Sequence, residues 1–401
     1  MMKEKEEKRV PQLRFPEFTD DWEQRKVGET VTEVSRPIEL NDYQEYQLVT
    51  VKRRNEGIVS RGKMYGKNIL VKNYFEIHAG DYLISKRQLV HGANGIVPEN
   101  LDKAVVSNEY MACVSNEFVT AEFLTLLSKT KSLQKDFFLS SYGVDIEKLV
   151  FDVEDWKKRS IIIPKIEEQN KICEYFSYLD HLITLHQRKL EKLKELKKGL
   201  VQKLFSQEVR FKADDGSEFP KWEEKRLSGL FGKVIEKNRL DLPALTIIQG
   251  YGTIRRDESE RKITYDEKGL KNYKAVQKDD FIVHLRSFEG GLEIANQDGI
   301  VSPAYHVYRG NDEVHPLFYY PYFRSSSFIK GKLAVCVTGV RDGKNIEMGA
   351  FDELLIPHPC LAEQQKIAEC LSALDDVIEK QKATLAAWEE LKKGLLQQMF
   401  V

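Results

Sequence analysis

A long segment that occurs twice is the feature that most constrains how this chain folds. The sequence Leu-Lys-Lys-Gly-Leu at 196–200 returns at 391–395, and Glu168-Gln169 returns as Glu363-Gln364, both at an offset of 195 residues. The register holds without a gap from Pro164 to Phe205 in the first copy. Duplication of one long element predicts two equivalent units related by an approximate two-fold axis.

Shorter echoes show where each unit begins. Trp22-Glu23 is matched by Trp222-Glu223, and a Phe-Pro dipeptide precedes each pair. Between these openings and the long segments, the two copies differ by insertions. We therefore expect a pseudo-two-fold chain with one globular domain at 1–163, a long-helix spacer at 164–208, a second globular domain at 209–357 and a C-terminal long-helix spacer at 358–401.

Composition bounds the class of protein. A chain of 401 residues with ordinary apolar content can build two, or three, domain-sized cores. Its five cysteines form no CxxC pair and no Cys/His cluster at zinc spacing, which favours reduced thiols and a cytoplasmic protein. The start, Met1 to Lys8, is charged with no apolar core after it, and no run of 18 apolar residues occurs, so we expect neither a signal peptide nor a membrane span. Because the net charge is −1, any site for a polyanion must be local.

Apolar residues in the duplicated segments step by four and by three. This spacing is typical of the seam of a coiled coil, and each copy predicts a helix of about 35 to 40 residues, or about 50 to 60 Å. Such a helix is longer than the core of one domain, so we expect the two copies to pair, antiparallel, along the following seam residues: Ile172, Phe176, Leu179, Ile183, His186, Leu190 and Leu193, with Ile367, Leu371, Leu374, Ile378, Gln381, Leu385 and Trp388. His186 and Gln381 occupy equivalent positions, where a polar residue either fixes register or turns its polar tip to solvent.

The segments outside the helices are mixed in type. β-Branched residues and turn punctuation predict strands at 46–52, 81–86, 103–114 and 160–163, and a helix at 120–131. The second copy supplies the segments 246–249, 281–285, 300–308, 318–326 and 354–356. We expect an α/β (α+β) fold in each globular half, followed by its long helix.

The motifs of common enzymes are missing from the sequence. No two prolines are adjacent, so the Pro-Pro-aromatic loop of amino-methyltransferases is absent, and neither a GxxxxGK[ST] nor a GxGxxG loop occurs. The nearest approach to a metal-binding carboxylate cluster is Asp-Ile-Glu-Lys at 145–148, which is more typical of a solvated charge run. The sequence predicts a noncatalytic protein without a metal or cofactor of its own.

Basic residues gather inside the variable interiors, at corresponding places in the two copies. Arg can bond guanine and Gln adenine through paired hydrogen bonds, whereas Lys suits phosphates. We expect these residues to lie in loops, or at the ends of strands, that contact DNA. The candidates are Lys52, Arg53, Arg54, Arg61, Lys63, Tyr65, Lys67, Lys86, Arg87 and Gln88 in the first copy, and Arg255, Arg256, Arg261, Lys262, His284 and Arg286 in the second.

Taken together, the doubled order of Phe-Pro, Trp-Glu, a variable interior, Glu-Gln-x-Lys-Ile, Leu-Asp and Leu-Lys-Lys-Gly-Leu closely resembles the specificity (S) subunit of bacterial type I restriction-modification enzymes. The resemblance covers essentially the whole chain. It implies two target-recognition domains that read the halves of a bipartite, asymmetric sequence in double-stranded DNA, with the paired helices acting as a ruler.

The resemblance also implies partners. Two modification subunits would dock on the helices and carry S-adenosylmethionine to methylate adenine, and restriction subunits would use ATP and Mg²⁺. Readers on one face of DNA sit about 34 to 36 Å apart, so four residues inserted near Glu191 should lengthen the recognised spacer. Two alternatives stay open on the sequence: a coiled-coil adaptor without direct DNA readout, and a stand-alone DNA nuclease.

Overall fold

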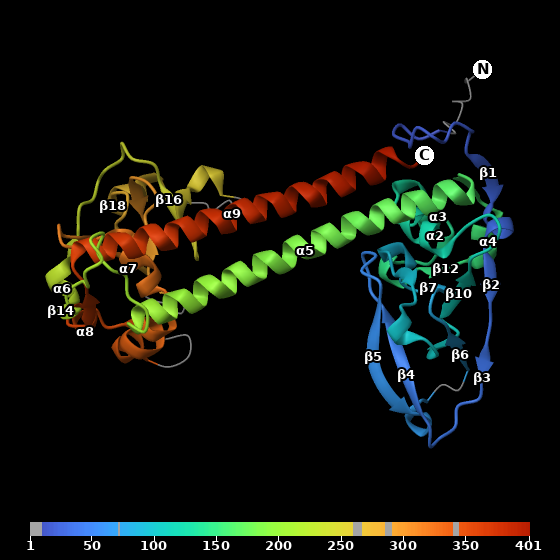
Figure 1. Ribbon diagram of the computed structural model, residues 1–401, viewed down its shortest axis with the longest axis horizontal. Helices are drawn as coiled ribbons and strands as arrows, with labels where there is room; N and C mark the ends of the chain where they lie inside the picture. The colour runs from blue at the N-terminus through green and yellow to red at the C-terminus, as the bar shows by residue number, and fades with distance from the viewer. Residues whose placement is uncertain (1–9, 71–72, 260–266, 285–290, 340–344) are drawn as a thin grey trace. The chain divides into compact units, whose positions relative to one another are not determined.

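The computed structural model describes residues 10–70, 73–259, 267–284, 291–339 and 345–401. The chain divides into two compact units, one made of residues 1–187 with 384–401 and the other of residues 188–383. The two long helices are α5 (Ile166–Phe205, 40 residues) and α9 (Leu361–Gln398, 38 residues), so the predicted helix lengths are confirmed. Each unit therefore contains a segment of both long helices, which Figure 1 labels α5 and α9.

Two sheets form the β-rich part of unit 1. A four-stranded sheet has the order β2 (Thr32–Val34), β10 (Tyr110–Val114), β7 (Tyr82–Ser85), β8 (Asn94–Ile96). A five-stranded sheet has the order β3 (Pro37–Ile38), β6 (Tyr74–Ile77), β9 (Ala104–Ser107), β4 (Glu45–Val51), β5 (Ile58–Tyr65). Only the β4–β9 pair is parallel within them. Strand β1 (Glu23–Lys26) pairs with β13 (Ser160–Ile163), which leads into α5.

Unit 2 repeats the first of these sheets but not the second. Its four-stranded sheet has the same order, with β15 (Phe231–Val234), β22 (Tyr305–Gly310), β19 (Phe281–His284) and β20 (Glu293–Ile294), and β14 (Glu223–Arg226) pairs with β25 (Leu355–His358). Where unit 1 has five strands, the described residues of unit 2 form two-stranded pairs: β16 (Leu245–Ile248) with β17 (Gly252–Arg255), and β18 (Lys274–Val276) with β21 (Gly299–Val301). The two units share a frame and differ in the variable interior.

Three segments that were each expected to be one element are two elements in the structure. The helix expected at 120–131 is α2 (Ala121–Leu127) followed by α3 (Lys131–Leu139), because Thr130 starts a new helix by accepting a hydrogen bond from the Leu133 amide. The strand expected at 103–114 is β9 and β10 with a turn between them. The strand expected at 300–308 is likewise β21 and β22, separated around Pro303, which has no amide hydrogen to give a ladder.

The hydrophobic core that includes the end of a long helix differs between the units, and smaller apolar clusters lie beside it in each. In unit 1, residues of α2 and α3 pack with Leu395 of α9 and with Met399 and Phe400, which follow this helix. In unit 2, residues of α7 (Pro316–Phe323) pack with Leu204 from the end of α5. The helices are thus parts of the domain cores as well as partners of each other.

Candidate nucleic-acid interface

A buried glutamate anchors the start of each long helix. Glu168 accepts hydrogen bonds from Arg14 Nε and Nη2, both at 2.7 Å, and from Trp22 Nε1 at 3.3 Å. This pairing raises the pKa of Arg14. A buried carboxylate needs such donors, because loss of its hydration is costly.

The second copy repeats this arrangement. Glu363 accepts hydrogen bonds from Arg210 at 3.1 and 2.7 Å and from Trp222 Nε1 at 2.9 Å. The Trp-Glu openings and the Glu-Gln motif, far apart in the sequence, therefore meet in each unit.

The neighbouring glutamine clamps the same helix start to the domain. Gln169 accepts from the Thr120 amide at 3.0 Å and donates to the carbonyls of Phe118 and Pro164 at 2.7 and 2.8 Å. Gln364 repeats this pattern with the His315 amide and two carbonyls, those of Glu313 and Pro359.

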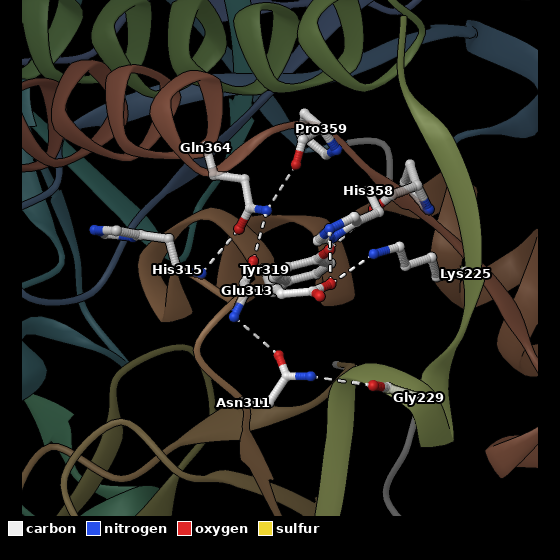
Figure 2. A network of polar contacts seen from close by, with 10 residues as sticks. Lys225, Gly229, Asn311, Glu313, His315, Tyr319, His358, Pro359 and Gln364 are labelled. Atoms are coloured by element: carbon white, nitrogen blue, oxygen red, sulfur yellow. Dashed lines mark hydrogen bonds and ion pairs between the residues drawn. The ribbon is translucent and has the colours of Figure 1, made fainter. Parts of the chain in front are cut away.

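Figure 2 shows the second clamp and the residues around it. Asn311 accepts a hydrogen bond from the Glu313 amide, and the Glu313 carboxylate pairs with Lys225 at 2.5 Å. The recurrent glutamine is structural in both copies, because all its polar atoms bind backbone.

The end of each long helix binds the start of the other. In unit 1, Lys392 of α9 pairs with Asp180 of α5, and the rings of Trp388 and His186 lie 6.2 Å apart. In unit 2, Lys197 of α5 pairs with Asp375 of α9. Residue numbers rise along one helix as they fall along the other, so the predicted antiparallel pairing is confirmed.

The last aromatic residue of each duplicated segment completes a core. Phe400 packs against Trp22, Phe123 and Phe176 at ring separations of 6.2, 5.6 and 6.2 Å. Phe205 packs against Trp222, Phe318 and Tyr322 at 6.5, 5.4 and 5.2 Å. Each repeat thus contributes its helix end to the unit that holds the globular domain of the other repeat.

The predicted seam residues all lie on the covered side of the helices. Most are buried, and the others, such as Leu193, Leu374 and Leu385, are half-buried. At the helix starts the seam also faces the domain: Ile172 and Phe176 belong to the core of unit 1, and Ile367 to that of unit 2. His186 stacks on Trp388, and Gln381 is 7% exposed; their role in register stays a prediction.

Several candidate contacts of the first copy lie on an exposed ribbon. Arg61, Lys63 and Tyr65 belong to β5, the edge strand paired with β4, as Figure 1 shows. The expectation that they lie in a loop was wrong. The register shift between Leu48 and Val49 and the positive φ of Gly62 (102°) allow the pairing to continue through the glycine. Residues 60–65 are exposed on both faces of the strand.

The turn of the same ribbon is held in place by backbone hydrogen bonds. Arg54 and Asn55 have positive φ of 60° and 56°, and their amides donate to the carbonyls of His91 and Gly92 at 2.7 and 2.9 Å. Arg53 pairs with Glu147 at 2.9 Å while half of its side chain stays exposed. A pocket of about 490 Å³ lies here, and His91 and Gln134 also line it.

Sequence reasoning missed the residues that complete this pocket. Asn55 of the turn, His91 of the 3₁₀ helix Leu89–His91, Gln134 of α3 and Glu147 of the 3₁₀ helix Ile146–Lys148 line this pocket with Arg53 and Arg54. The candidate residues Lys86, Arg87 and Gln88 adjoin this pocket, because the backbone carbonyl of Gln88 accepts a hydrogen bond from the His91 amide at 3.1 Å. Lys86 donates to the Asn108 carbonyl at 3.0 Å, and Arg87 pairs with exposed Glu109 at 2.5 Å. No spacing along the chain signals that Gln134 and Arg54 line one pocket.

The remaining cations of the first copy are weakly held. Lys52 and Lys63 lie 3.9 and 4.0 Å from Glu56 and Glu45, and Lys67 lies over the ring of Tyr65 at 5.9 Å. Exposed pairs of this kind contribute about 0 to 1 kcal/mol. A phosphate can therefore replace the carboxylate at little cost.

Candidate residues of the second copy lie at the ends of β17 and β19. Arg255 pairs with Asp257 at 2.8 Å, and Arg256 lies over the ring of Tyr273 and donates to its hydroxyl at 3.3 Å. The ring of His284 lies 5.0 Å from that of Tyr305. Arg261, Lys262 and Arg286 lie outside the described residues.

Within the described residues, no cluster of three or more His, Cys, Asp or Glu side chains is arranged to hold a metal ion. Burial raises the pKa of the Cys113 and Cys173 thiols to about 12, which opposes thiolate chemistry. None of the helices in the described ranges combines the length and apolar character that a membrane crossing requires.

Comparison with known proteins follows the division into two copies. A family profile described as "Type I restriction modification DNA specificity domain" matches residues 19–195 and again residues 220–387. The type I restriction enzyme MjaVIII specificity subunit of Methanocaldococcus jannaschii is 26% identical over 98% of this chain and 95% of its own length. A second protein of that organism, the putative type I restriction enzyme MjaX specificity subunit, is 28% identical over 60% of this chain and 58% of its own length.

Solved structures share the fold at low identity. The HsdS subunit from Thermoanaerobacter tengcongensis aligns with a TM-score of 0.53 and 17% identity over 94% of this chain and 96% of its own. The type I restriction-modification S subunit from M. genitalium aligns with a TM-score of 0.54 and 14% identity over 98% of this chain and 99% of its own. Two β-rich domains, each followed by a long helix of a pair, are common to these proteins and this chain.

Proposed function

Because the chain belongs to the type I restriction-modification specificity family, whose members are noncatalytic specificity subunits, we propose that it reads a bipartite, asymmetric DNA target with one half-site for each globular domain. The two long helices would set the number of base pairs between the half-sites. The alternatives of an adaptor without DNA readout and of a stand-alone nuclease predict no such target.

One observation carries this proposal: a common frame presents two different sets of exposed cations. In unit 1, Arg61 and Lys63 lie on β5, the exposed edge strand that forms a hairpin with β4 in the five-stranded sheet, and Arg54 lies at the turn of this hairpin. In unit 2, Arg255 and Arg256 lie at the end of a shorter pair of strands. The major groove admits a two-stranded ribbon, and Arg reads guanine there. Different ribbons in one frame favour two different half-sites.

The repeat also supports two equivalent partners. A pseudo-two-fold protein offers the same surface twice, and two modification subunits would occupy these surfaces, with restriction subunits joining the full complex. S-adenosylmethionine, ATP and Mg²⁺ would be bound by those subunits, which would supply methylation and cleavage.

Methylation mapping tests the proposal. A host that carries this chain with its modification subunit should show one methylated bipartite sequence, and the mapped duplex should bind the purified complex in fluorescence anisotropy with a steep salt dependence. Equal affinity for the mapped and a scrambled duplex would favour the adaptor. Cleavage of DNA by the chain alone with Mg²⁺ would favour the nuclease.

A further inference from the structure

The variable interior of each unit contains a hairpin at the same place in the fold. Leu48 of β4 pairs in parallel with Val105 of β9, and Ala244, just before β16, pairs in parallel with Ile300 of β21. Val105 and Ile300 are related by the offset of 195 residues. The β4–β5 hairpin of unit 1 and the β16–β17 hairpin of unit 2 are therefore equivalent, although their lengths differ.

The turns of the two hairpins expose different side chains. The turn of unit 1, residues 52–57, exposes Arg53 and Arg54, and the turn of unit 2, residues 249–251, exposes Gln249. Sequence reasoning did not select Gln249. Arg can bond guanine and Gln adenine through paired hydrogen bonds, and such a side chain selects a base only where its support holds it in one position.

In unit 1, a relay of three polar side chains joins the shared frame to the turn. Ser128, at the end of α2, donates a hydrogen bond to Asn94 of β8 at 2.7 Å, and Asn94 Nδ2 donates to Asn55 Oδ1 at 3.2 Å. Ser128 and Asn94 are 1% and 2% exposed. Loss of one member of a buried relay leaves its neighbour without a partner.

The backbone of this turn needs support. Arg54 and Asn55 have φ of 60° and 56°, a left-handed conformation that residues other than glycine keep only where their surroundings impose it. Their amides donate to the carbonyls of His91 and Gly92, in the segment that leads into β8. Asn55 is thus held by its backbone and by its side chain, and the direction of the Arg54 side chain follows from this turn.

Unit 2 holds its turn through a buried carboxylate. Glu293 of β20 is 6% exposed and accepts hydrogen bonds from the Gly250 amide at 2.9 Å and from the Tyr320 hydroxyl of α7 at 3.0 Å. It also pairs with Arg324 at the end of α7. Hydrogen bonds to an ionised carboxylate are stronger than those between neutral groups, so this relay fixes the turn at Gly250.

The two relays follow one route through the fold. Each runs from the end of a helix, α2 or α7, to the last strand of the four-stranded sheet, β8 or β20, and then to the hairpin turn. Arg324 corresponds to Lys129, the neighbour of Ser128, at the offset of 195 residues. The route belongs to the shared frame, whereas the residues along it differ as the turns do.

We propose that the hairpin turn of each unit selects bases and that its buried relay positions it. On the proposed function, Arg54 contacts a guanine in one half-site and Gln249 an adenine in the other. Asn94, Ser128 and Glu293 touch no DNA and act through these turns as positioning residues. Each half-site therefore depends on buried side chains as well as on exposed ones.

Variants of the full-length chain, in complex with the modification subunit, test the inference. Asn94→Ala breaks the relay of unit 1, and Glu293→Gln leaves one acceptor oxygen for the three donors in unit 2. Ser128→Ala and Tyr320→Phe are milder changes in the same relays, and they replace the first two if thermal unfolding shows that those do not fold. Gln249→Ala tests the turn of unit 2 without disturbing a buried group.

Controls with comparable contacts lie elsewhere in the same units. Asn116 holds another turn of unit 1 by accepting hydrogen bonds from the Phe118 and Val119 amides at 2.9 and 3.0 Å. Asp280 of unit 2 is a 2% exposed carboxylate that pairs with Arg309 at 2.7 Å. Asn116→Ala and Asp280→Asn should lower the thermal stability as the relay variants do, and should leave the choice of bases unchanged.

Methylation mapping and anisotropy with singly substituted duplexes give the readout. Asn94→Ala should reduce discrimination at one position of the half-site of unit 1 by about tenfold, and Glu293→Gln and Gln249→Ala should do the same in the other half-site. Because Asn94 acts through Arg54, Asn94→Ala added to Arg54→Ala should relax no further position. A purely structural role would lower the amount of active complex and leave the ratio of affinities unchanged.

The opposing outcomes are distinct. Wild-type discrimination in the folded relay variants would overturn the inference, and an unchanged half-site in Gln249→Ala would overturn it for unit 2. Equal relaxation in the Asn116→Ala and Asp280→Asn controls would also overturn it, because the effect would then follow stability. If the wild-type complex defines no bipartite target at all, the proposed function itself fails.

Discussion

Asp180 of the first long helix pairs with Lys392 of the second, and their counterparts at an offset of 195, Asp375 and Lys197, pair in the same way. In the sequence these residues belong to the recurrent Leu-Asp and Leu-Lys-Lys-Gly-Leu motifs. The motifs therefore recur because each binds the other across the helix pair. The ion pairs are partly exposed, so they add little to the free energy of unfolding and serve mainly to fix the register of the two helices.

The aromatic side chains at the helix ends should contribute more to the free energy of unfolding than the ion pairs do. Phe400→Ala is expected to lower the free energy of unfolding by about 3 to 5 kcal/mol, because it leaves a cavity among buried rings. Leu391→Ala, on the exposed side of the same helix, should change it by less than about 0.5 kcal/mol. Urea denaturation measures both, and hydrogen exchange should show the loss first in α2. Equal effects of the two variants would contradict the exchange of helix ends.

Helix length should set spacer length, provided that both helices change together. Lys197 follows Asp180 by 17 positions, as Lys392 follows Asp375. An insertion in α5 alone would therefore pull one of the two Lys–Asp ion pairs out of register. Seven residues inserted after Gln187 and seven after Ala383 keep the seam in phase and add about 10 Å. The methylated sequence should then gain about three base pairs of spacer, at 3.4 Å each.

The sequence alone favoured four residues inserted near Glu191 to lengthen the spacer, but the structure pairs Lys197 with Asp375 and Lys392 with Asp180, so an insertion in α5 alone is the matched control. It should destabilise the chain and reduce methylation without defining a longer spacer. An unchanged spacer after the paired insertion would show that the helices do not measure the distance.

Arg54 should contribute to base choice in one half-site. Arg54→Ala is expected to cost about 1 to 3 kcal/mol of binding and to relax one position of that half-site, while the other half-site stays unchanged. Lys63→Ala, which would remove a phosphate contact, should weaken binding to all sequences and reduce the salt slope by about 1. Methylation mapping and anisotropy across salt concentrations distinguish the two effects. Relaxation in both half-sites would contradict one domain per half-site.

Acid should destabilise unit 2 through His358, which lies beside the Gln364 contacts at the start of α9. Burial lowers the pKa of His358, Lys225 acts in the same direction, and its ring faces the Tyr319 hydroxyl at 3.0 Å and the Glu313 carboxylate at 3.4 Å. Below about pH 6.5 the unfolded chain binds a proton that the folded chain does not, so stability is full above this pH and falls as the pH drops towards the lower folded value. One such proton changes the free energy by at most about 1.4 kcal/mol per pH unit.

Thermal unfolding between pH 5 and 7.5 checks this prediction. His358→Gln should flatten the pH dependence, whereas His181→Gln, at an exposed position of α5, should leave it unchanged. A wild-type slope that survives in His358→Gln would assign the effect to other groups.

Much of the fold could be predicted because the signals were local. The four-and-three spacing of apolar residues reports contacts within one or two helical turns, and both long helices have the predicted lengths. The predicted helix at 120–131 was wrong because one residue, Thr130, ends the run and starts a new helix as its N-cap. The strand β5 was missed because glycine and lysine indicate a loop until β4 is known to pair with them.

The sequence by itself determined the two-fold repeat, the long helices and the family, because these depend on residue order and on periodicity along the chain. Only the tertiary structure decided which residues meet across it: Lys392 with Asp180, Phe400 with Trp22, and Gln134 beside Arg54. These residues lie more than 75 positions apart in the sequence, and the packing of whole elements brings them together, which local sequence patterns do not encode.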